Sequence, residues 1–453
     1  MQPFPPLSLM KYAYPSLLAL CAAALLTSCG DDHDESSETP GGQQESAAAA
    51  GQSETAGATL SAAATPSAEA SGGAAVQADD KAEGSDFAAA GESGTTADGS
   101  IGATMAAAGA AVAVAADDDA DPDALLAQAD ELLRSNRAEQ QAQALPLLRR
   151  AAEAGQTEAA FRLGFCYANG IGTQPQADEA RKWLSMAAEK NHPSALAHLG
   201  LLCDKLSKDE TVAAEALGYY RRAAELGQVE AQVILAYKLA AQPESQAEAL
   251  EWLRKAAAQK NDRALCALGV FTLEGRGGLK ADPVEAYRLF EQAAELGSAD
   301  GLCNQAYCLE RGLGVKADPE KAVELYTKLL EKAPLPQALY NLALCRMDGR
   351  GTEKDSHAGV QLLVQAYNAG HVEAACELAR CCAAGIGLQK NEEQAVQILH
   401  EAARRGSAEA QYTLACCYRE GKGVKKDETI AETYLKAAAA NGHPKAVEGL
   451  KAQ

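Results

Sequence analysis

One helical motif recurs eight times in the second two-thirds of the 453-residue chain, and its spacing constrains the fold more than any single residue does. Each copy has a small anchor residue, a leucine or glutamine four positions later, and then Gly or Ala. The anchors are Ala159, Ala195, Ala231, Ala264, Gly301, Ala338, Ala374 and Ala410, spaced by 36, 36, 33, 37, 37, 36 and 36 residues. Such periods are typical of repeat proteins whose units stack side by side. The small residue after the leucine predicts a helix whose backbone lies very close to a neighbouring helix.

Six copies also carry a Gly-x-Gly pair, which begins at Gly170, Gly275, Gly312, Gly349, Gly385 and Gly421. Because glycine tolerates positive φ and ends helices, each pair predicts the turn that closes a first helix. A nucleotide-binding loop needs a preceding strand and a third glycine, and neither is present. A second helix is then expected to start after an N-cap residue at Asp318, Asp355, Asn391 or Asp427.

These patterns resemble the Sel-one-like repeat family, an α/α relative of the tetratricopeptide solenoids. The resemblance is carried by Leu-Gly-Phe-Cys-Tyr-Ala-Asn-Gly-Ile-Gly at 163–172 and by Ala-Gln-Tyr-Thr-Leu-Ala-Cys-Cys-Tyr-Arg-Glu-Gly-Lys-Gly-Val at 410–424. It covers roughly residues 123–453, and eight copies make it specific. The second and third copies depart from it, since they lack the Gly-x-Gly turn.

The resemblance implies an all-α solenoid of about eight to nine helix pairs over residues 122–453. We expect a divergent pair at 123–158 that caps the array, repeats over 159–445 and a closing helix at 446–453. Solenoids present a continuous surface along their repeats, and this surface is where they bind partners.

Residues 1–29 are expected to be a lipoprotein signal peptide. The apolar run 17–26 is too short to span a bilayer and ends in Leu-Thr-Ser-Cys, which resembles the bacterial lipobox. The resemblance implies that Cys29 is acylated and becomes the mature N-terminus, and Gly30 in place of Asp favours the outer membrane. A signal peptide also needs a positive charge before the apolar run. Residues 1–9 have none, whereas Lys11 follows Met10, so translation starts at Met1 or, as this charge favours, at Met10. We therefore expect a lipid-anchored protein of the cell envelope, with the periplasmic or surface face left open.

The segment 30–121 is rich in Ala, Gly, Ser and Glu, with 18 acidic residues against Lys81 alone. Its net charge of −17, out of −21 for the chain, leaves −4 for the rest. Such a composition buries too little apolar area to offset the entropy of ordering, so we expect a disordered tether with a reach on the order of 50 Å. The acidity argues against nucleic acid as a partner.

Eleven of the thirteen cysteines fall in predicted first helices. Equivalent positions on successive packed helices lie about 8 to 10 Å apart, beyond the Cα separation of a disulfide. We expect mostly buried thiols, with some disulfides or metal binding as alternatives. Six of the seven histidines lie at positions that we interpret as unrelated within the repeats, and His33 lies in the acidic segment, so no metal site and no cofactor are expected.

No catalytic motif stands out in the chain. Neither Ser-x-x-Lys after residue 29 nor Gly-x-Ser-x-Gly occurs, which disfavours β-lactam hydrolysis of the kind associated with a cysteine-rich branch of the family. We expect no enzyme activity.

A second stripe on the first helices, at positions two, six and nine from each anchor, holds aromatic and charged residues. Resemblance to tetratricopeptide repeats puts these positions on the concave face, where they would form a groove for an extended or helical peptide. The alternative is that they lie in the interior of a tightly wound superhelix. The candidate groove residues are Phe161, Phe165, Tyr237, Tyr307, Tyr340, Arg380, Tyr412 and Arg419, with Cys266, Cys303, Leu344 and Glu310 on the same stripe.

The sequence thus predicts a monomeric, membrane-anchored scaffold that binds a protein or peptide and catalyses nothing. Two rivals remain. One is a cell-envelope enzyme acting on β-lactams or peptidoglycan, and the other is a surface-exposed or secreted effector or adhesin that acts on host proteins.

Overall fold

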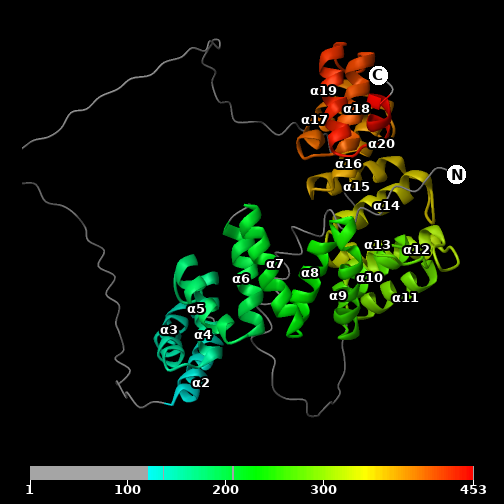
Figure 1. Cartoon of the computed structure of the whole chain (residues 1–453). Coiled ribbons are helices and arrows are strands. Elements are labelled where there is room, and N and C mark those ends of the chain that lie inside the picture. Colours follow the sequence, from blue (N-terminus) through cyan, green and yellow to red (C-terminus); the bar gives the residue numbers. More distant parts are fainter. Residues whose placement is uncertain (1–120, 136, 207–208, 452–453) are drawn as a thin grey trace, which may run out of the picture. The chain divides into compact units, whose positions relative to one another are not determined.

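The structure, a computed structural model, describes residues 121–135, 137–206 and 209–451, and within these ranges all regular structure is helical (Figure 1). Residues 1–120, with the signal peptide, Cys29 and nearly all of the acidic segment, lie outside the described residues. None of the described helices is long and apolar enough to span a membrane.

The helices alternate between a first and a second helix of each repeat. The first helices are α4 (Thr157–Asn169), α6 (Pro193–Leu206), α8 (Val229–Ala240), α10 (Asp262–Glu274), α12 (Ala299–Arg311), α14 (Pro336–Asp348), α16 (Val372–Ala384) and α18 (Ala408–Glu420). The second helices are α5 (Ala177–Glu189), α7 (Glu210–Glu225), α9 (Gln246–Ala258), α11 (Pro283–Glu295), α13 (Pro319–Lys332), α15 (Ser356–Asn368), α17 (Glu392–Arg404) and α19 (Glu428–Ala440). The pair α2 (Pro122–Leu133) and α3 (Ala138–Glu153) precedes them, and α20 (Pro444–Lys451) follows.

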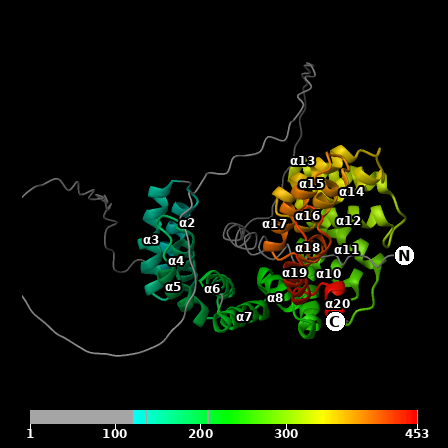
Figure 2. The same cartoon turned by 90° about the horizontal axis from the view of Figure 1, so that it is seen from above.

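Each helix packs against the next one along the chain, and the pairs follow one another in chain order (Figures 1 and 2). First helices also contact the first helix of the following repeat, as α4 does with α6, α10 with α12, and α12 with α14. The prediction of an all-α solenoid of helix pairs is confirmed.

The helices begin and end at the capping residues that the sequence predicts. The first glycine of each Gly-x-Gly pair is the left-handed C-cap of its helix, as at Gly349, with φ of 75° and its N–H bonded to the carbonyl of Cys345. The predicted N-caps are confirmed as well. Asp318 accepts the N–H of Lys321 at 3.0 Å, and the residues at the same position in the next three repeats bond in the same way, namely Asp355, Asn391 and Asp427.

The small residue after each leucine lets the two helices of a repeat approach closely, as predicted. A Cβ atom built on Gly200 would lie 2.8 Å from the Tyr220 ring, and one on Gly269 would lie 2.6 Å from Phe290. Tyr220 and Phe290 are among the largest fully buried side chains, so each glycine makes the space that an aromatic ring fills.

The second glycine of the pair joins neighbouring repeats. Gly351 follows α14 and lies against the first residue of α13, in the preceding repeat, with a φ of +65°. A Cβ atom there would lie 2.0 Å from the carbonyl oxygen of Pro319. Four other repeats make the equivalent contact, at Gly277, Gly314, Gly387 and Gly423. This glycine is therefore required both for its φ and for the close approach of two repeats.

Candidate interaction surface

Three of the predicted groove residues are buried. Phe161 and Phe165, on α4, are 3% and 6% exposed, because His198 of α6 lies edge-on to both rings, with centroids 5.4 and 5.2 Å away. Tyr237, on α8, is 9% exposed and belongs to the same hydrophobic core. In the first three repeats the stripe is thus covered by the array itself, which is the alternative that the sequence left open.

The stripe reaches the surface in repeats five to eight. Tyr307 on α12, Tyr340 on α14 and Tyr412 on α18 are half-buried. Arg380 on α16 is exposed and bonds Glu377 at 2.7 Å, and Arg419 on α18 is exposed and bonds Glu428 at 3.2 Å. We call Tyr307, Tyr340, Arg380, Tyr412 and Arg419 the tyrosine face. On the same stripe, Leu344 is half-buried, whereas Cys266, Cys303 and Glu310 are buried.

Two tyrosines of this face stack on histidines that stand directly before α16 and α20. The ring of Tyr340 lies 4.6 Å from that of His371 with 17° between their planes, and the ring of Tyr412 lies 4.2 Å from that of His443 with 13° between them. Phe161 stacks on His192 in the same way, at 4.6 Å and 21°. In each case the ring pair fixes a first helix against the start of the following repeat.

These histidines also cap helices. Nδ1 of His192, His371 and His443 accepts the N–H of the residue three positions on, at 3.2, 3.1 and 3.3 Å. Since Nδ1 accepts, Nε2 carries the proton, and it donates to a residue in the first turn of the preceding first helix. The acceptors are Glu158 at 2.8 Å, Gln337 at 3.0 Å and Glu409 at 2.9 Å. We call each set of cap, acceptor and ring stack a histidine clasp.

The interpretation of the histidines as scattered is therefore wrong for these three. His192 and His371 lie three residues before the anchors Ala195 and Ala374, and His443 lies at the position that would precede a further anchor. The signal was present in the sequence, because an aromatic residue stands 31 positions before each of these histidines. It was missed because the repeats were compared with anchors inside helices, and a cap position lies outside them.

A buried chain of hydrogen bonds leads from the tyrosine face into the array. The carboxylate of Glu310 is 2% exposed and pairs with the guanidinium groups of Arg350 and Arg311, the latter at 3.1 Å. It also accepts the hydroxyl of Tyr326 at 3.3 Å, and burial raises the pKa of that hydroxyl. Glu310 lies on the stripe that was predicted to line the groove, but these contacts already use its oxygens.

The chain continues to the clasp at His371. Asn341 donates to the hydroxyl of Tyr326 at 3.2 Å and accepts from Gln337 at 3.1 Å, and the Gln337 oxygen faces His371. One connected network thus spans α12, α13, α14 and the start of α16. Buried polar networks of this kind fix one geometry, because each lost bond leaves a buried group unpaired.

A family model for the Sel1 repeat matches the chain eight times, at residues 157–192, 193–228, 229–261, 262–298, 299–333, 336–371, 372–407 and 408–443. The chain belongs to the Sel1 repeat family. The pair α2 and α3 and the helix α20 lie outside the eight matched Sel1 repeats.

Relatives with sequence similarity include chitin synthase regulatory factor 3 of Schizosaccharomyces pombe, 26% identical over 185 residues, and a chitin synthase regulator of Saccharomyces cerevisiae, 27% identical over 237 residues. These matches cover 39% and 50% of this chain but only 20% and 30% of those relatives. A solved structure of a protective antigen present in uropathogenic Escherichia coli strains, which displays an SLR fold, is 27% identical with a TM-score of 0.52. That likeness covers 70% of this chain and 68% of the other. A Sel1 repeat array is a scaffold fold consistent with protein–protein interaction.

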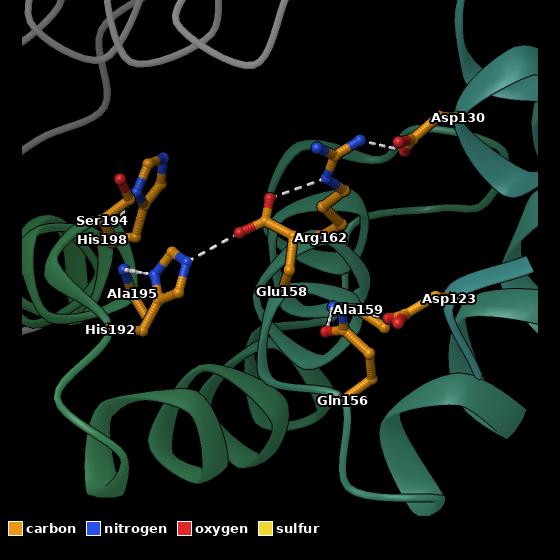
Figure 3. Close-up of polar contacts among 10 residues, drawn as sticks. All are labelled: Asp123, Asp130, Gln156, Glu158, Ala159, Arg162, His192, Ser194, Ala195 and His198. Atoms are coloured by element: carbon orange, nitrogen blue, oxygen red, sulfur yellow. Dashed lines mark hydrogen bonds and ion pairs between the residues drawn. The ribbon is translucent and has the colours of Figure 1, made fainter. Parts of the chain in front are cut away.

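The clasp in the first Sel1 repeat has the composition of a catalytic dyad but not its geometry. Figure 3 shows Asp130, Arg162, Glu158 and His192 in one line of polar contacts, with Arg162 Nε 2.7 Å from Glu158. Burial tends to raise the pKa of Glu158, but hydrogen bonds from His192 and Arg162 outweigh it and hold the pKa below its ordinary value. A general base needs a free ring nitrogen, and both nitrogens of His192 are engaged. This cluster therefore holds repeats together rather than transferring protons.

The cysteines of the described first helices are thiols. Burial raises the pKa of Cys308, Cys345 and Cys376 to about 12, so these groups stay protonated and are poor nucleophiles. Among the described residues, no group of three or more His, Cys, Asp or Glu side chains is placed to hold a metal ion.

Proposed function

We propose that this protein is a membrane-anchored scaffold that binds a segment of another protein on the tyrosine face of repeats five to eight. The observation that carries the proposal is that three tyrosines on one stripe of the first helices are only half-buried, although the aromatic residues on this stripe are buried in the first three repeats. Tyrosine is enriched at interfaces, because its ring supplies apolar contact area and its hydroxyl supplies a hydrogen bond.

The histidine clasps support this proposal, because they hold Tyr340 and Tyr412 in place before any partner arrives. A ring that is already ordered loses little conformational entropy on binding. Arg380 and Arg419 are exposed on the same stripe and add polar contacts, and arginine is also enriched at interfaces. We infer that the lipid at Cys29 and the acidic segment 30–121 tether the array to the outer membrane.

The names of the fungal relatives describe regulators of a chitin synthase. A regulator of that kind acts on a protein, which agrees with a scaffold role. We do not extend the proposal to a chitin synthase, since the matches cover less than a third of those relatives.

The proposal is tested with a photo-crosslinking amino acid placed at Tyr307 or at Tyr412 in the cell that makes the protein. Lys328, which is exposed on the second helix α13, is the matched control position. A discrete adduct from the two tyrosine positions and none from Lys328 is expected. Equal adducts from all three positions, or none at the tyrosines, would contradict the proposal.

Substitutions then separate binding from folding. Tyr412→Ala should weaken capture of the crosslinked partner by roughly 1 to 3 kcal/mol, and, because it also removes the ring stacked on His443, it should lower the helical melt slightly. Leu342→Ala removes a leucine that is 5% exposed between packed helices and should destabilise by roughly 2 to 5 kcal/mol. If Tyr412→Ala melts as early as Leu342→Ala, the tyrosine belongs to the core and the face is misplaced.

A further inference from the structure

The clasp between the sixth and seventh repeats differs from the other two in the group that faces Nε2. His371 donates to the neutral amide oxygen of Gln337, whereas His192 and His443 face the carboxylates of Glu158 and Glu409. A proton added to Nδ1 would remove the helix cap in all three clasps, because Nδ1 would then be a donor facing another donor. In the two carboxylate clasps the new charge is balanced at Nε2. In the His371 clasp the group at Nε2 is a neutral amide, so the new charge has no counter-charge at that atom.

The surroundings of His371 make a positive charge on its ring costly. The side chain is 3% exposed, and the ring of Tyr340 covers one of its faces. Its nearest ionisable neighbour is Glu373 of α16, with Oε2 3.7 Å from Nδ1. Burial lowers the pKa of His371, and the charge of Glu373 opposes that shift only in part.

The other ionisable groups near this clasp affect the pKa of the Tyr340 hydroxyl rather than the pKa of the His371 imidazole. They are Glu377 and Cys376 on α16 and Arg311 on α12. Burial raises the pKa of Tyr340, so its hydroxyl stays protonated throughout the range in which a histidine titrates. His371 is therefore the group at this junction whose charge changes in mild acid, because burial lowers the pKa of its imidazole from the ordinary histidine value.

We propose that His371 makes the junction between repeats six and seven acid-sensitive: when its Nδ1 takes up a proton, the cap of α16 is lost and the clasp that holds Tyr340 opens. The Gln337 side chain then loses its fixed hydrogen-bond partner. As a result, the buried hydrogen-bond network that continues through Asn341 to Tyr326 loosens. The consequence for binding rests on the proposed function, because Tyr340 is part of the tyrosine face. Acid would then weaken binding at repeats five to seven before the helices themselves unfold.

The direction of the pH effect follows from the neutral state of the folded clasp. An unfolded histidine titrates near pH 6.5, while the folded clasp resists the proton. The stabilisation by the clasp is therefore complete above about pH 6.5 and is lost as the pH falls below that value.

The junction is tested by hydrogen exchange on the full chain at pH 7.5 and 5.5, corrected for the intrinsic effect of pH on exchange. Protection at the start of α16, residues 372–378, should fall about fivefold or more at pH 5.5, as expected when a helix cap is lost. The start of α18 is an internal control, because its cap is Ser407, whose Oγ accepts the N–H of Ala410 at 3.2 Å and does not titrate.

Two variants complete the test. His371→Asn keeps a capping side chain without a titratable group and should show the same protection at both pH values. Gln337→Glu supplies the missing carboxylate and should move the transition to higher pH, because it favours the charged ring. Unchanged protection of the wild-type α16 at pH 5.5, an equal loss in His371→Asn, or a transition that Gln337→Glu leaves in place or lowers would each overturn the proposal.

The failure of this inference and of the proposed function can be told apart. A junction that opens in acid, together with no crosslinked partner at any pH, would contradict the binding role and leave the acid-sensitive clasp standing. A junction that stays closed, together with a specific crosslink at Tyr412, would contradict the clasp alone.

Discussion

The contact of the second glycine of each Gly-x-Gly pair with the preceding repeat leads to a sharp test of what holds the array together. Gly351→Ala places a methyl group where the carbonyl oxygen of Pro319 is 2.0 Å away. An alanine at a φ of +65° is strained by roughly 1 to 2 kcal/mol. Forcing the two repeats apart adds the cost of overpacking, about 1 to 3 kcal/mol. We expect Gly351→Ala to destabilise the array by roughly 2 to 5 kcal/mol, with the damage at the junction of repeats five and six.

Gly370→Ala is the matched control, because it lies in the same repeat, has a φ of +90° and has no atom within 4 Å of an added Cβ. It carries the backbone strain without the clash and should cost roughly 1 to 2 kcal/mol. Urea unfolding followed by circular dichroism gives the difference, and hydrogen exchange of α13 and α14 locates it, since repeat arrays need not unfold in one step. Equal destabilisation by the two substitutions would refute the idea that the second glycine joins the repeats.

Other parts of the chain give three further predictions. Burial lowers the pKa of His198 to about 4, so the array should lose roughly 3 kcal/mol of stability as the pH falls from 6.5 to 4, and His198→Gln should remove that part of the pH dependence. Alkylation in denaturant without reductant, read by mass spectrometry, should find the cysteines of the first helices as thiols; four or more native disulfides would overturn our packing argument. Cys29→Ala should leave the protein uncleaved or unacylated, and a variant that is processed and fractionates like the wild type would refute the lipoprotein prediction.

Much of the fold could be predicted from local chemistry. The helix pairs, the glycine C-caps and the Asp or Asn N-caps depend on residues within a few positions of each other, so a single sequence contains the whole signal. The close approach at Gly200 and Gly269 was predictable for a similar reason, because a missing side chain in a leucine-rich helix indicates a tight contact. These features required no knowledge of how one repeat meets the next.

The contacts between repeats were harder to predict. The second glycine of each pair was assigned to a turn, and its role against the preceding helix became visible only when two repeats were placed side by side. The histidine clasps have the same character, since the cap, the acceptor and the stacked ring come from residues about 31 to 34 positions apart. The sequence of one helix likewise predicts a hydrophobic stripe, but it does not indicate which residues of that stripe are buried by the next repeat.

The comparison of Phe161 with Tyr412 shows what decides that last point. The two residues stand at the same position in their repeats, and each stacks on a clasp histidine. Phe161 is buried because the following first helix presents His198 three residues after its anchor, and that ring meets Phe161 edge-on. At the equivalent position after Tyr412 stands Gly449, where no atom lies within 4 Å of an added Cβ. The clasp therefore orders the aromatic ring in both repeats, while the residue three positions after the next anchor is one difference between them: it covers Phe161 and leaves Tyr412 half-buried.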